Sequence, residues 1–526
     1  MTTVAKTGKH VLDTLTIGMY TDPLTIFREY IQNSSDAIDD AITSEVLLSI
    51  NDAEINIRID PKKDFISIRD NGIGISQKDV EQTLLDIGNS QKRFSENRGF
   101  RGIGRLAGLT YCDKLVFKTS AKNEDVMSTQ TWDCLKFRQL LTPGQYEDYD
   151  ASRVISEVTK TTQSPTTSEE HFFEVELQGV SHYQDDFLDD EKVRNYLCQV
   201  APIPFRHRSF PYDLDGDRGG IIPYATSLGY PLSEYRICFN DEGNYLTKPH
   251  KSHVRLQHEE DHVRGINFIE EKDSDDNLIF WGWYAQTDFK GALSEDLLKG
   301  LRLRVKNIQV GDHKTLESYF SQPRFCRWFF GEIHACYDGL IPNGRRDYLE
   351  PNGAYKIFKK ALEKHTHHLS KLPPAYSDHN AADKKVKKAQ VKLEEFNNKK
   401  EEGFSSPEEQ EKKANELQET INKANQASIK KDKASDKIKS LTNRVPRSTI
   451  SNDTIKEVTK LAEEATSSSV QGTLSKKEQY EFTPFLHGQH GKIKVFIKKL
   501  LTELDGSEEY DERFSDKVKE LLKKVL

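Results

Sequence analysis

The chain has 526 residues, which is long enough for two or three domains with substantial hydrophobic cores. Its formal net charge of −8 argues against a surface covered by nucleic acid, although it leaves room for a local basic groove. No apolar run is long enough to span a bilayer and residues 1–6 start no secretory signal, so we expect a cytoplasmic protein without a membrane partner.

The spacing of cysteine and histidine predicts no metal centre of the zinc type. The six cysteines are scattered along the chain, which favours reduced thiols over disulfides or a metal site. His365, His367 and His368 cluster, but no cysteine or carboxylate pattern surrounds them, so an exposed helix surface is favoured over metal ligation.

The first predicted helix follows Asp22 and Pro23, an acidic N-cap residue and a proline at the first helical position. Glu29, Asn33 and Asp36 are spaced by four and then three residues, so they lie on one face of this helix. Carboxylates and an amide on one face can hold Mg²⁺ together with phosphates and can activate a water molecule. The alternative interpretation is an ordinary solvated polar face.

A predicted strand over residues 66–68 ends in a turn that contains two glycines. Gly72 and Gly74 allow the backbone to turn tightly and to approach a flat ligand, which larger side chains would block. Asp70, at the end of the strand, can accept a hydrogen bond from an exocyclic amine such as that of adenine. Taken alone, the segment is also typical of an ordinary Asn-Gly turn.

A third motif has glycines at Gly99, Gly102 and Gly104 and leads into an apolar segment that starts at Leu106. Glycines before the start of a helix expose backbone N–H groups that can cradle phosphate, with the helix dipole behind them. A single glycine-rich loop of this kind is also common in ordinary turns.

Together and in this order, the three motifs resemble the GHKL (Bergerat-fold) ATPase superfamily. The likeness is greatest to the ninety-kilodalton heat-shock chaperones, through the helix motif from Glu29 to Ala37 and the segment from Thr83 to Ser90. The chain is also similar to MutL- and MORC-type ATPases. The resemblance implies a Bergerat-fold domain, a two-layer α/β sandwich, over residues 1–185 that binds ATP with Mg²⁺.

The resemblance also implies roles for single residues. Glu29 is expected to be the general base that activates water, Asn33 the Mg²⁺ ligand, and Asp70 the residue that recognises adenine. The glycines of the third motif would wrap the phosphates. The expected nucleotide-binding residues, of which Ser90 and Lys92 lie near a lid, are Asn33, Asp36, Ala37, Asp70, Gly72, Gly74, Ser90, Lys92, Gly99, Gly102, Ile103 and Gly104.

The sequence departs from the chaperone pattern in two places. The lid expected between Lys92 and Gly99 is much shorter than in the chaperones. The family also places Gly-Thr before the last strand of the pocket, whereas Glu169 and Glu170 precede the corresponding strand here, residues 171–177. No threonine contact with adenine is therefore carried over.

Residues 190–375 form a predicted α+β second domain, in the position of the chaperones' middle domain and of the transducer domain of MutL and type II topoisomerases. Strands are expected over residues 280–284 and 301–310. A loop over residues 339–349 resembles the chaperone loop that sends an arginine to the γ-phosphate, which points to Arg345 or Arg346 without distinguishing them. The alternative interpretation is a structural ion pair between one of these arginines and Asp347. Lys306 is the second candidate for the γ-phosphate contact, because MutL and the topoisomerases use a lysine of the transducer domain for it.

Beyond residue 375 the composition changes to Lys, Glu, Ala and Asn. Apolar residues at heptad-like steps on both sides of Gly403 predict an antiparallel helical hairpin within a charged helical region over residues 380–470. A disordered charged linker is the alternative. Residues 475–526 are predicted to be helical and to end in an amphipathic helix, which packs on its own domain or forms a dimer or partner surface.

The whole pattern favours an ATP-driven molecular clamp that closes by ATP-dependent homodimerisation and acts on a protein client. The alternative is a DNA-acting clamp of the MutL, MORC or topoisomerase type, for instance in a prokaryotic defence system, although nucleic acid is the less favoured partner. A histidine kinase is a third class, disfavoured because no phospho-acceptor helix pair precedes the ATPase domain.

Overall fold

The computed structural model describes residues 7–16, 22–88, 98, 102–214, 219–240, 243–442, 446 and 459–460. The predicted α+β class is confirmed, as are long helices beyond residue 370. The chain divides into two compact units, residues 1–380 with 432–447 and residues 381–431 with 448–526. The helical region predicted over residues 475–526 lies outside the described residues.

A seven-stranded sheet is the framework of the first domain, in the order β5-β4-β3-β6-β2-β1-β7. Neighbouring strands are antiparallel, except that β7 is parallel to β1. The register aligns Ile57, Ile68, Val175 and Phe117 across the sheet, so one buried apolar row crosses it. The strands are β1 (Ile55–Asp60), β2 (Phe65–Asp70), β3 (Cys112–Ser120), β4 (Val126–Asp133), β5 (Thr159–Pro165), β6 (Phe172–Val180) and β7 (Ile237–Phe239).

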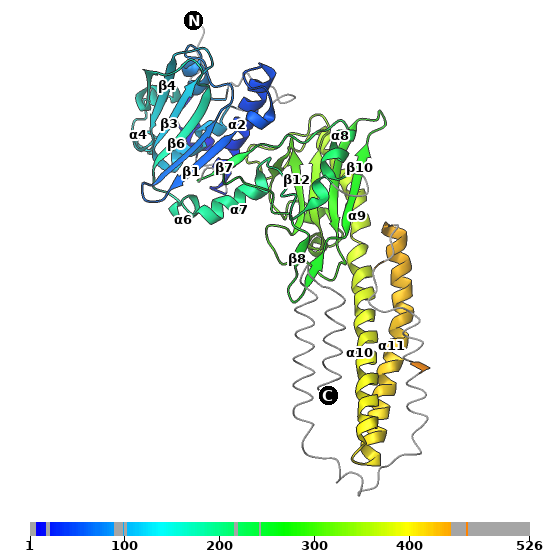
Figure 1. Ribbon diagram of the computed structural model, residues 1–526. Helices are drawn as coiled ribbons and strands as arrows, with labels where there is room; N and C mark the ends of the chain where they lie inside the picture. Colours follow the sequence, from blue (N-terminus) through cyan, green and yellow to red (C-terminus); the bar gives the residue numbers. More distant parts are fainter. Residues whose placement is uncertain are drawn as a thin grey trace, which may run out of the picture. The chain divides into compact units, whose positions relative to one another are not determined.

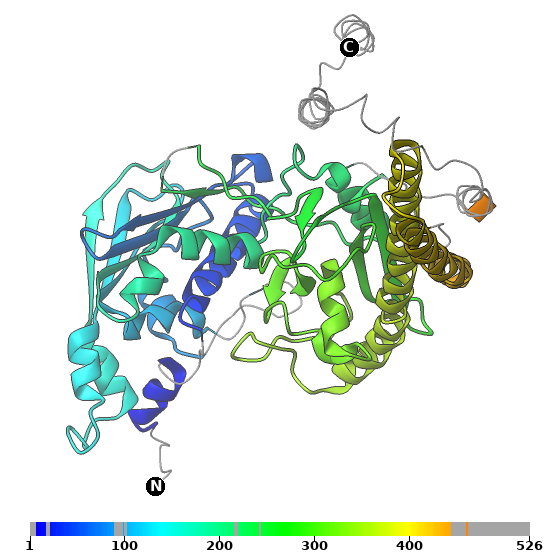
Figure 2. The same cartoon turned by 90° about the horizontal axis from the view of Figure 1, so that it is seen from below.

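Helices pack on this sheet as a second layer and share one hydrophobic core with it, as the two views show. Phe27, Ile31 and Ile38 of α2, the long dark-blue helix of Figure 2, are buried in this core at helical spacing. The helical segments are α1 (His10–Thr16), α2 (Thr25–Thr43), α3 (Val80–Leu85), α4 (Cys134–Leu140), α5 (Ala151–Val158), α6 (Gln184–Phe187) and α7 (Asp190–Val200), with the 3-10 turns η1 (Ile50–Asp52) and η2 (Gly104–Thr110).

Helix α2 begins two residues later than the sequence predicts. Its N-cap residue is Leu24, whose backbone N–H donates to Oδ1 of Asp22 at 3.0 Å. The N–H of Thr25 donates to the carbonyl of Asp22 and that of Ile26 to the carbonyl of Pro23, which makes a tight turn ahead of the helix. The expected N-cap is wrong because Asp22 closes this turn and not the first turn of α2.

The first core extends beyond residue 185, where the sequence suggested a domain boundary. Tyr235, Ile237 and Phe239 belong to it, and β7 lies beside β1 at the edge of the sheet. Helix α7 contributes Val193 and Leu197 to the same core. A strand of three residues is too short to give a periodic pattern, so its pairing with β1 was not predictable from the sequence.

The second domain contains a five-stranded sheet in the order β10-β11-β14-β12-β13. Strand β11 is buried on both faces, because Phe280 and Tyr284 lie in one core while Trp281 and Trp283 lie in another. This double burial explains the unbroken apolar run in the sequence. The strands are β8 (His253–Arg255) and β9 (Glu260–His262), which pair separately, and β10 (Gly265–Lys272), β11 (Leu278–Gln286), β12 (Gly300–Val305), β13 (Ile308–Val310) and β14 (Phe330–Ala335).

The strand expected over residues 301–310 is a hairpin of β12 and β13. Its turn consists of Lys306 and Asn307, whose φ angles of 49° and 63° are typical of a two-residue hairpin turn. The helical elements of this domain are α8 (Ile221–Ser227) and α9 (Gly353–Leu369), with the 3-10 turns η3 (Pro211–Asp213), η4 (Glu317–Tyr319) and η5 (Pro323–Trp328).

The predicted helical hairpin is confirmed by α10 (Leu372–Glu402) and α11 (Pro407–Thr442), which lie side by side in Figure 1. Ser406 Oγ accepts from the N–H of Glu409 at 3.2 Å, and Glu409 Oε2 accepts from the N–H of Ser405 at 2.8 Å, so α11 has a side-chain cap. An apolar core joins the two helices, formed by Val386, Ala389, Leu393, Phe396, Leu417, Ile421 and Ala424.

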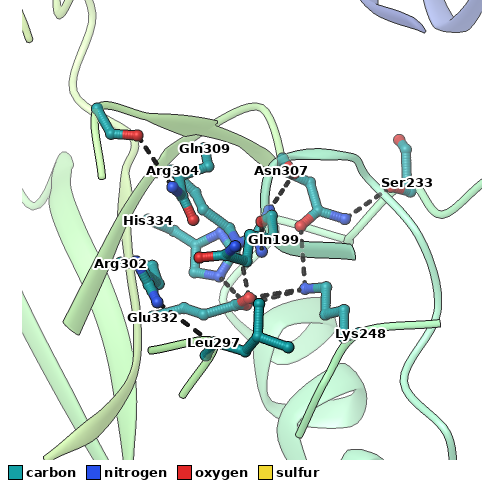
Figure 3. Close-up of polar contacts among 11 residues, drawn as sticks. Gln199, Ser233, Lys248, Leu297, Arg302, Arg304, Asn307, Gln309, Glu332 and His334 are labelled. Atoms are coloured by element: carbon teal, nitrogen blue, oxygen red, sulfur yellow. Dashed lines mark hydrogen bonds and ion pairs between the residues drawn. The ribbon is translucent and has the colours of Figure 1, made fainter. Parts of the chain in front are cut away.

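A cluster of charged side chains is buried between the second sheet and α7 (Figure 3). Glu332 on β14 accepts from Lys248 Nζ at 2.9 Å and from Arg304 Nε at 2.6 Å, and it lies 3.2 Å from His334 Nε2. Arg304 also donates to the carbonyl of Gln199 in α7 at 2.8 Å. The cluster therefore ties the second sheet to a helix of the first core.

Burial and charge shift the pKa values in this cluster in different directions. Burial alone would raise the pKa of Glu332, but Arg304 and Lys248 hold it well below its ordinary value. Burial, with Arg304 nearby, lowers the pKa of Lys248 to about 8. Burial lowers the pKa of His334 to about 4.

The structure also gives the state of the six cysteines and the exposure of the three clustered histidines. All six cysteines are free thiols. His367 and His368 are exposed on α9, whereas His365 is half-buried and lies 2.6 Å from Oε2 of Glu271. Within the described residues, no helix combines the length and the apolar character needed to cross a bilayer.

Candidate nucleotide site

The first domain contains a cavity of about 580 Å³, walled by α2, the end of β2, α3 and the start of η2. Gly344 and Arg346, from a loop of the second domain, line it as well. A cavity of this volume suits a small-molecule or nucleotide ligand.

Helix α2 presents Glu29, Asn33, Ala37 and Asp40 to the cavity. These residues are spaced by four, four and three positions, so they form one stripe along the helix. The end of the cavity next to Glu29 is largely enclosed, since this residue is only 5% exposed. Glu29 and Asn33 offer a carboxylate and an amide one helical turn apart at the wall of the cavity. Both groups can supply an oxygen ligand, and the carboxylate can also accept a proton.

Asp36 is not among the residues that line the cavity. Its Oδ1 accepts from the backbone N–H of Arg98 at 2.9 Å and from Nη1 of Arg98 at 3.4 Å. Nη1 also donates to Asp39 at 2.5 Å, and Nε of Arg98 donates to the carbonyl of Lys306 at 3.2 Å. Asp36 therefore holds Arg98 in place beside α2, and Lys306 contacts Arg98 through its backbone carbonyl.

The end of β2 supplies another wall. Asp70 is 2% exposed, and its Oδ1 accepts from the N–H of Gly72 at 3.0 Å. Gly74 lines the cavity at φ +70°, and a Cβ there would lie 2.0 Å from the carbonyl oxygen of Ser120. Gly72 does not line the cavity. A Cβ on it would lie 2.7 Å from Ala37, so packing against α2, and not approach to a ligand, requires this glycine.

The loop before η2 brings its backbone against the carboxylate of α2. Gly102, Ile103 and Gly104 line the cavity. A Cβ on Gly104 would lie 2.4 Å from Oε2 of Glu29, so a larger residue here would have to displace the Glu29 carboxylate. The other residues expected in this region lie outside the described part of the chain: Ser90, Lys92 and Gly99.

The structure distinguishes the two candidate arginines of the second domain. Arg346 is 7% exposed and its Nε donates to Oε1 of Glu29 at 3.3 Å, whereas Arg345 is exposed. The ion pair of Arg346 is with Glu29, and Oδ1 of Asp347 accepts from Asn343 at 2.6 Å. A cation of the second domain thus meets a carboxylate of the first in one cavity.

Sequence reasoning missed part of the cavity wall. Residues in and around α3, between 76 and 86, line it, as do Asp40 and Arg105. Asp40 continues the helical spacing of Glu29 and Asn33, so that spacing could have identified it. Arg105 follows directly on the glycine motif, but nothing in its position along the chain marks it as a lining residue.

The charges of the described wall are mostly negative. Its carboxylates are Glu29, Asp40, Asp70, Asp79 and Asp86, against the guanidinium groups of Arg105 and Arg346. Asn33 and Glu29 offer oxygen ligands of the kind that Mg²⁺ prefers, which fits an ion held mainly by the phosphates of a nucleotide. Within the described residues, no group of three or more His, Cys, Asp or Glu side chains could hold a metal by itself.

Comparison with known proteins agrees with this geometry. A family model described as histidine kinase-, DNA gyrase B-, and HSP90-like ATPase matches residues 22–163. The chaperone protein HtpG of Alcanivorax borkumensis is 23% identical over 370 residues, which cover 66% of this chain and 54% of HtpG. HtpG of Shigella flexneri is 22% identical over 382 residues, 68% of this chain and 55% of the relative. The chain thus spans about half the length of these curated relatives.

Proposed function

We propose that this protein binds ATP with Mg²⁺ and hydrolyses it to ADP and phosphate, because the family model of histidine kinase-, DNA gyrase B-, and HSP90-like ATPases matches residues 22–163. The observation that carries the proposal is the meeting of Glu29 and Arg346, 3.3 Å apart in one cavity. Asn33, Asp70 and the glycines before η2 line the same cavity and support it.

Glu29 is the proposed general base. Its carboxylate would take a proton from the water that attacks the γ-phosphorus, while the bond from phosphorus to the bridging oxygen breaks and ADP leaves. Mg²⁺, held on the protein side by Asn33, would supply positive charge to the phosphate oxygens. Asp70 would accept a hydrogen bond from the adenine amine, since its buried carboxylate lines the cavity.

Arg346 is the proposed sensor of the γ-phosphate. A γ-phosphate carries more negative charge and more acceptor oxygens than a carboxylate, so it would draw the guanidinium away from Glu29. This transfer would free Glu29 for proton abstraction and would hold the loop of the second domain on the nucleotide. Hydrolysis removes that contact, which couples the nucleotide to the second domain.

We further propose that the protein is a cytoplasmic, chaperone-like clamp that closes as a homodimer and acts on a protein client. The name of the similar HtpG proteins supports the chaperone-like role, and the free thiols support a reducing compartment. Light scattering should show a monomer with ADP and a dimer with a non-hydrolysable ATP analogue. An unchanged mass in both conditions would remove the ATP dependence of dimerisation from the proposal, and the monomer mass in both would remove the dimer.

The test of the ATPase is Glu29→Gln in the full-length protein. Glutamine keeps the shape of the side chain and an acceptor for Arg346 but cannot take the proton, so turnover should fall by about 10²–10⁴-fold with little change in ATP affinity. The control is Glu81→Gln, which changes an exposed glutamate of α3 that does not line the cavity. Unchanged turnover in Glu29→Gln would remove Glu29 from the chemistry, and a wild type that does not bind ATP would overturn the whole proposal.

A further inference from the structure

Arg105 is the first residue after the glycine motif and lines the cavity at the start of η2. Helix α2 holds its backbone in place, because the hydroxyl of Tyr30 donates to the carbonyl of Arg105 at 3.2 Å and accepts from the N–H of Gly108 at 3.1 Å. The guanidinium reaches the wall formed by α3, where Nη2 donates to the carbonyl of Asp86, the C-cap residue. The side chain therefore lies along the cavity wall between two fixed points.

The Arg105 guanidinium retains hydrogen-bonding capacity. Its one side-chain hydrogen-bond partner among the described residues is the carbonyl of Asp86, and its Nε is buried without a partner. Burial lowers the pKa of Arg105 to about 10, which still leaves it charged at neutral pH. A half-buried cation whose one side-chain hydrogen bond goes to a backbone carbonyl, with the charge of Asp86 nearby, still has N–H groups that an anionic ligand would satisfy.

The other cation of the described wall is already engaged. Arg346 is hydrogen-bonded to Glu29, so its charge is opposed by a carboxylate. The remaining carboxylates of the wall would repel the phosphates of a nucleotide. Among the described residues of the first domain's wall, Arg105 is thus the cation that can meet that charge.

We propose that Arg105 binds the phosphate chain of the nucleotide and so selects nucleotides over nucleosides. The proposal rests on the proposed function, because it assigns a further residue to the same site. A guanidinium forms charge-assisted hydrogen bonds with phosphate oxygens, and Nε remains available while Nη2 stays on Asp86. The competing interpretation is a structural tie between η2 and α3, which would not distinguish one ligand from another.

The experiment measures the affinities of ATP, ADP, AMP and adenosine for the full-length protein and its variants. Arg105→Gln should weaken ATP and ADP binding by about 10- to 100-fold and leave adenosine binding unchanged. Inorganic pyrophosphate should displace ADP from the wild type and should lose this effect in the variant. The control is Arg58→Gln, an exposed arginine on β1 of the same sheet, which should behave as the wild type.

Arg105→Lys is the second variant, since it keeps the charge but cannot form the guanidinium fork. Its affinity for ATP should fall less than that of Arg105→Gln, and its affinity for adenosine should not change. If Arg105→Gln does not fold, Arg105→Lys tests the phosphate contact in its place. Equal losses for ATP and adenosine, or unchanged ATP affinity in a folded variant, would overturn the proposal. The proposal would also be overturned if the wild type bound adenosine as tightly as it binds ATP and ADP. A wild type that binds none of the four ligands would contradict the proposed function itself.

Discussion

At the scale of single residues, the backbone of Arg346 determines which of two neighbouring arginines enters the cavity. Its φ of +60° places it in the left-handed region, and its N–H donates to the carbonyl of Asn343 at 3.0 Å. Its carbonyl accepts from the N–H of Gly311 at 2.9 Å and from Nη1 of Arg28 at 3.1 Å. These contacts fix a turn that directs the Arg346 side chain into the cavity. The sequence alone does not show which of two adjacent arginines points inward.

The first prediction compares the two arginines. Arg346→Ala should slow ATP hydrolysis by about 10²–10³-fold with nearly unchanged ADP affinity, because the lost contact is to the γ-phosphate alone. Arg345→Ala is the matched control and should change turnover little, since that side chain is exposed. Steady-state ATPase assays and ADP titrations measure both. A larger loss from Arg345→Ala, or from Lys306→Ala, would move the sensor to that residue.

The second prediction concerns His334 and pH. Burial lowers its pKa to about 4 from an ordinary 6.5, so below pH 6.5 the unfolded chain binds a proton that the folded chain binds only near pH 4. The stability that this histidine contributes is therefore present above pH 6.5 and is lost as the pH falls toward 4. The tryptophan fluorescence of urea unfolding should detect this loss, because His334 stacks on Trp281 with ring centroids 4.3 Å apart.

The variant His334→Gln should be less sensitive to acid. Between pH 7 and 5 the wild type should lose on the order of 2 kcal/mol of unfolding free energy more than the variant. His182→Gln, at an exposed histidine, should keep the full sensitivity of the wild type. Equal pH dependence in wild type and His334→Gln would show that this histidine already titrates normally in the folded state.

At the scale of elements, the turn after β2 packs closely against the end of β3 at the cavity wall. Gly74 and Gly144 have similar φ angles of +70° and +79°, so an alanine would be strained to a similar extent at both. A Cβ on Gly74 would meet the carbonyl oxygen of Ser120 at 2.0 Å, whereas no atom lies within 4 Å of a Cβ on Gly144. The pair of substitutions therefore separates backbone strain from a steric clash at the cavity wall.

The third prediction follows from this pair. Gly74→Ala should destabilise the protein by about 1–3 kcal/mol more than Gly144→Ala, because backbone must move to admit the methyl group. It should also weaken nucleotide binding, whereas Gly144→Ala should bind as the wild type does. Thermal unfolding and ATP titration measure the two effects. Equal stability and equal affinity in the two variants would mean that the backbone around Gly74 moves to admit the methyl group without a measurable loss of stability or binding.

Elements with a local pattern could be predicted from the sequence, and those set by distant contacts could not. Strands β2 and β6 alternate or carry apolar runs, and the α10–α11 hairpin has both a heptad pattern and a capping motif. Strand β7 pairs with β1 across about 180 residues of chain and has three residues of its own. Arg105 and Arg346 enter the site through hydrogen bonds to residues far away in the sequence, which no local pattern encodes.

At the scale of the whole molecule, several polar contacts join the first core to the second sheet and its loops. Three of them are Arg346 to Glu29, Arg98 to the carbonyl of Lys306, and Arg304 to the carbonyl of Gln199. The first lies in the cavity and the second lies beside the helix that lines it, so both would respond to a bound nucleotide. The third belongs to the buried cluster around Glu332, in which Arg304 and Lys248 both donate to the Glu332 carboxylate (Figure 3).

The charges on the helical hairpin bear on the class of client. Lys431 is buried and pairs with Asp383 at 2.6 Å, so it is not presented to a ligand. Lys392, Lys399 and Lys423 each pair with a glutamate three or four residues away. This alternation of lysine and glutamate along the two helices gives no continuous basic stripe. Because proteins bind duplex DNA chiefly through lysine and arginine contacts with its phosphates, the hairpin is poorly suited to bind a duplex.

The last prediction is therefore weak or no binding of duplex DNA at about 150 mM salt, where the Debye length is about 8 Å. Fluorescence anisotropy of a labelled duplex with the full-length protein, with and without an ATP analogue, measures the affinity. The comparison variant replaces Lys384, Lys385, Lys387 and Lys388 by glutamine, because these are the densest lysines of α10. Tight binding by the wild type that falls steeply with salt and is lost in this variant would contradict a protein client and favour the DNA clamp.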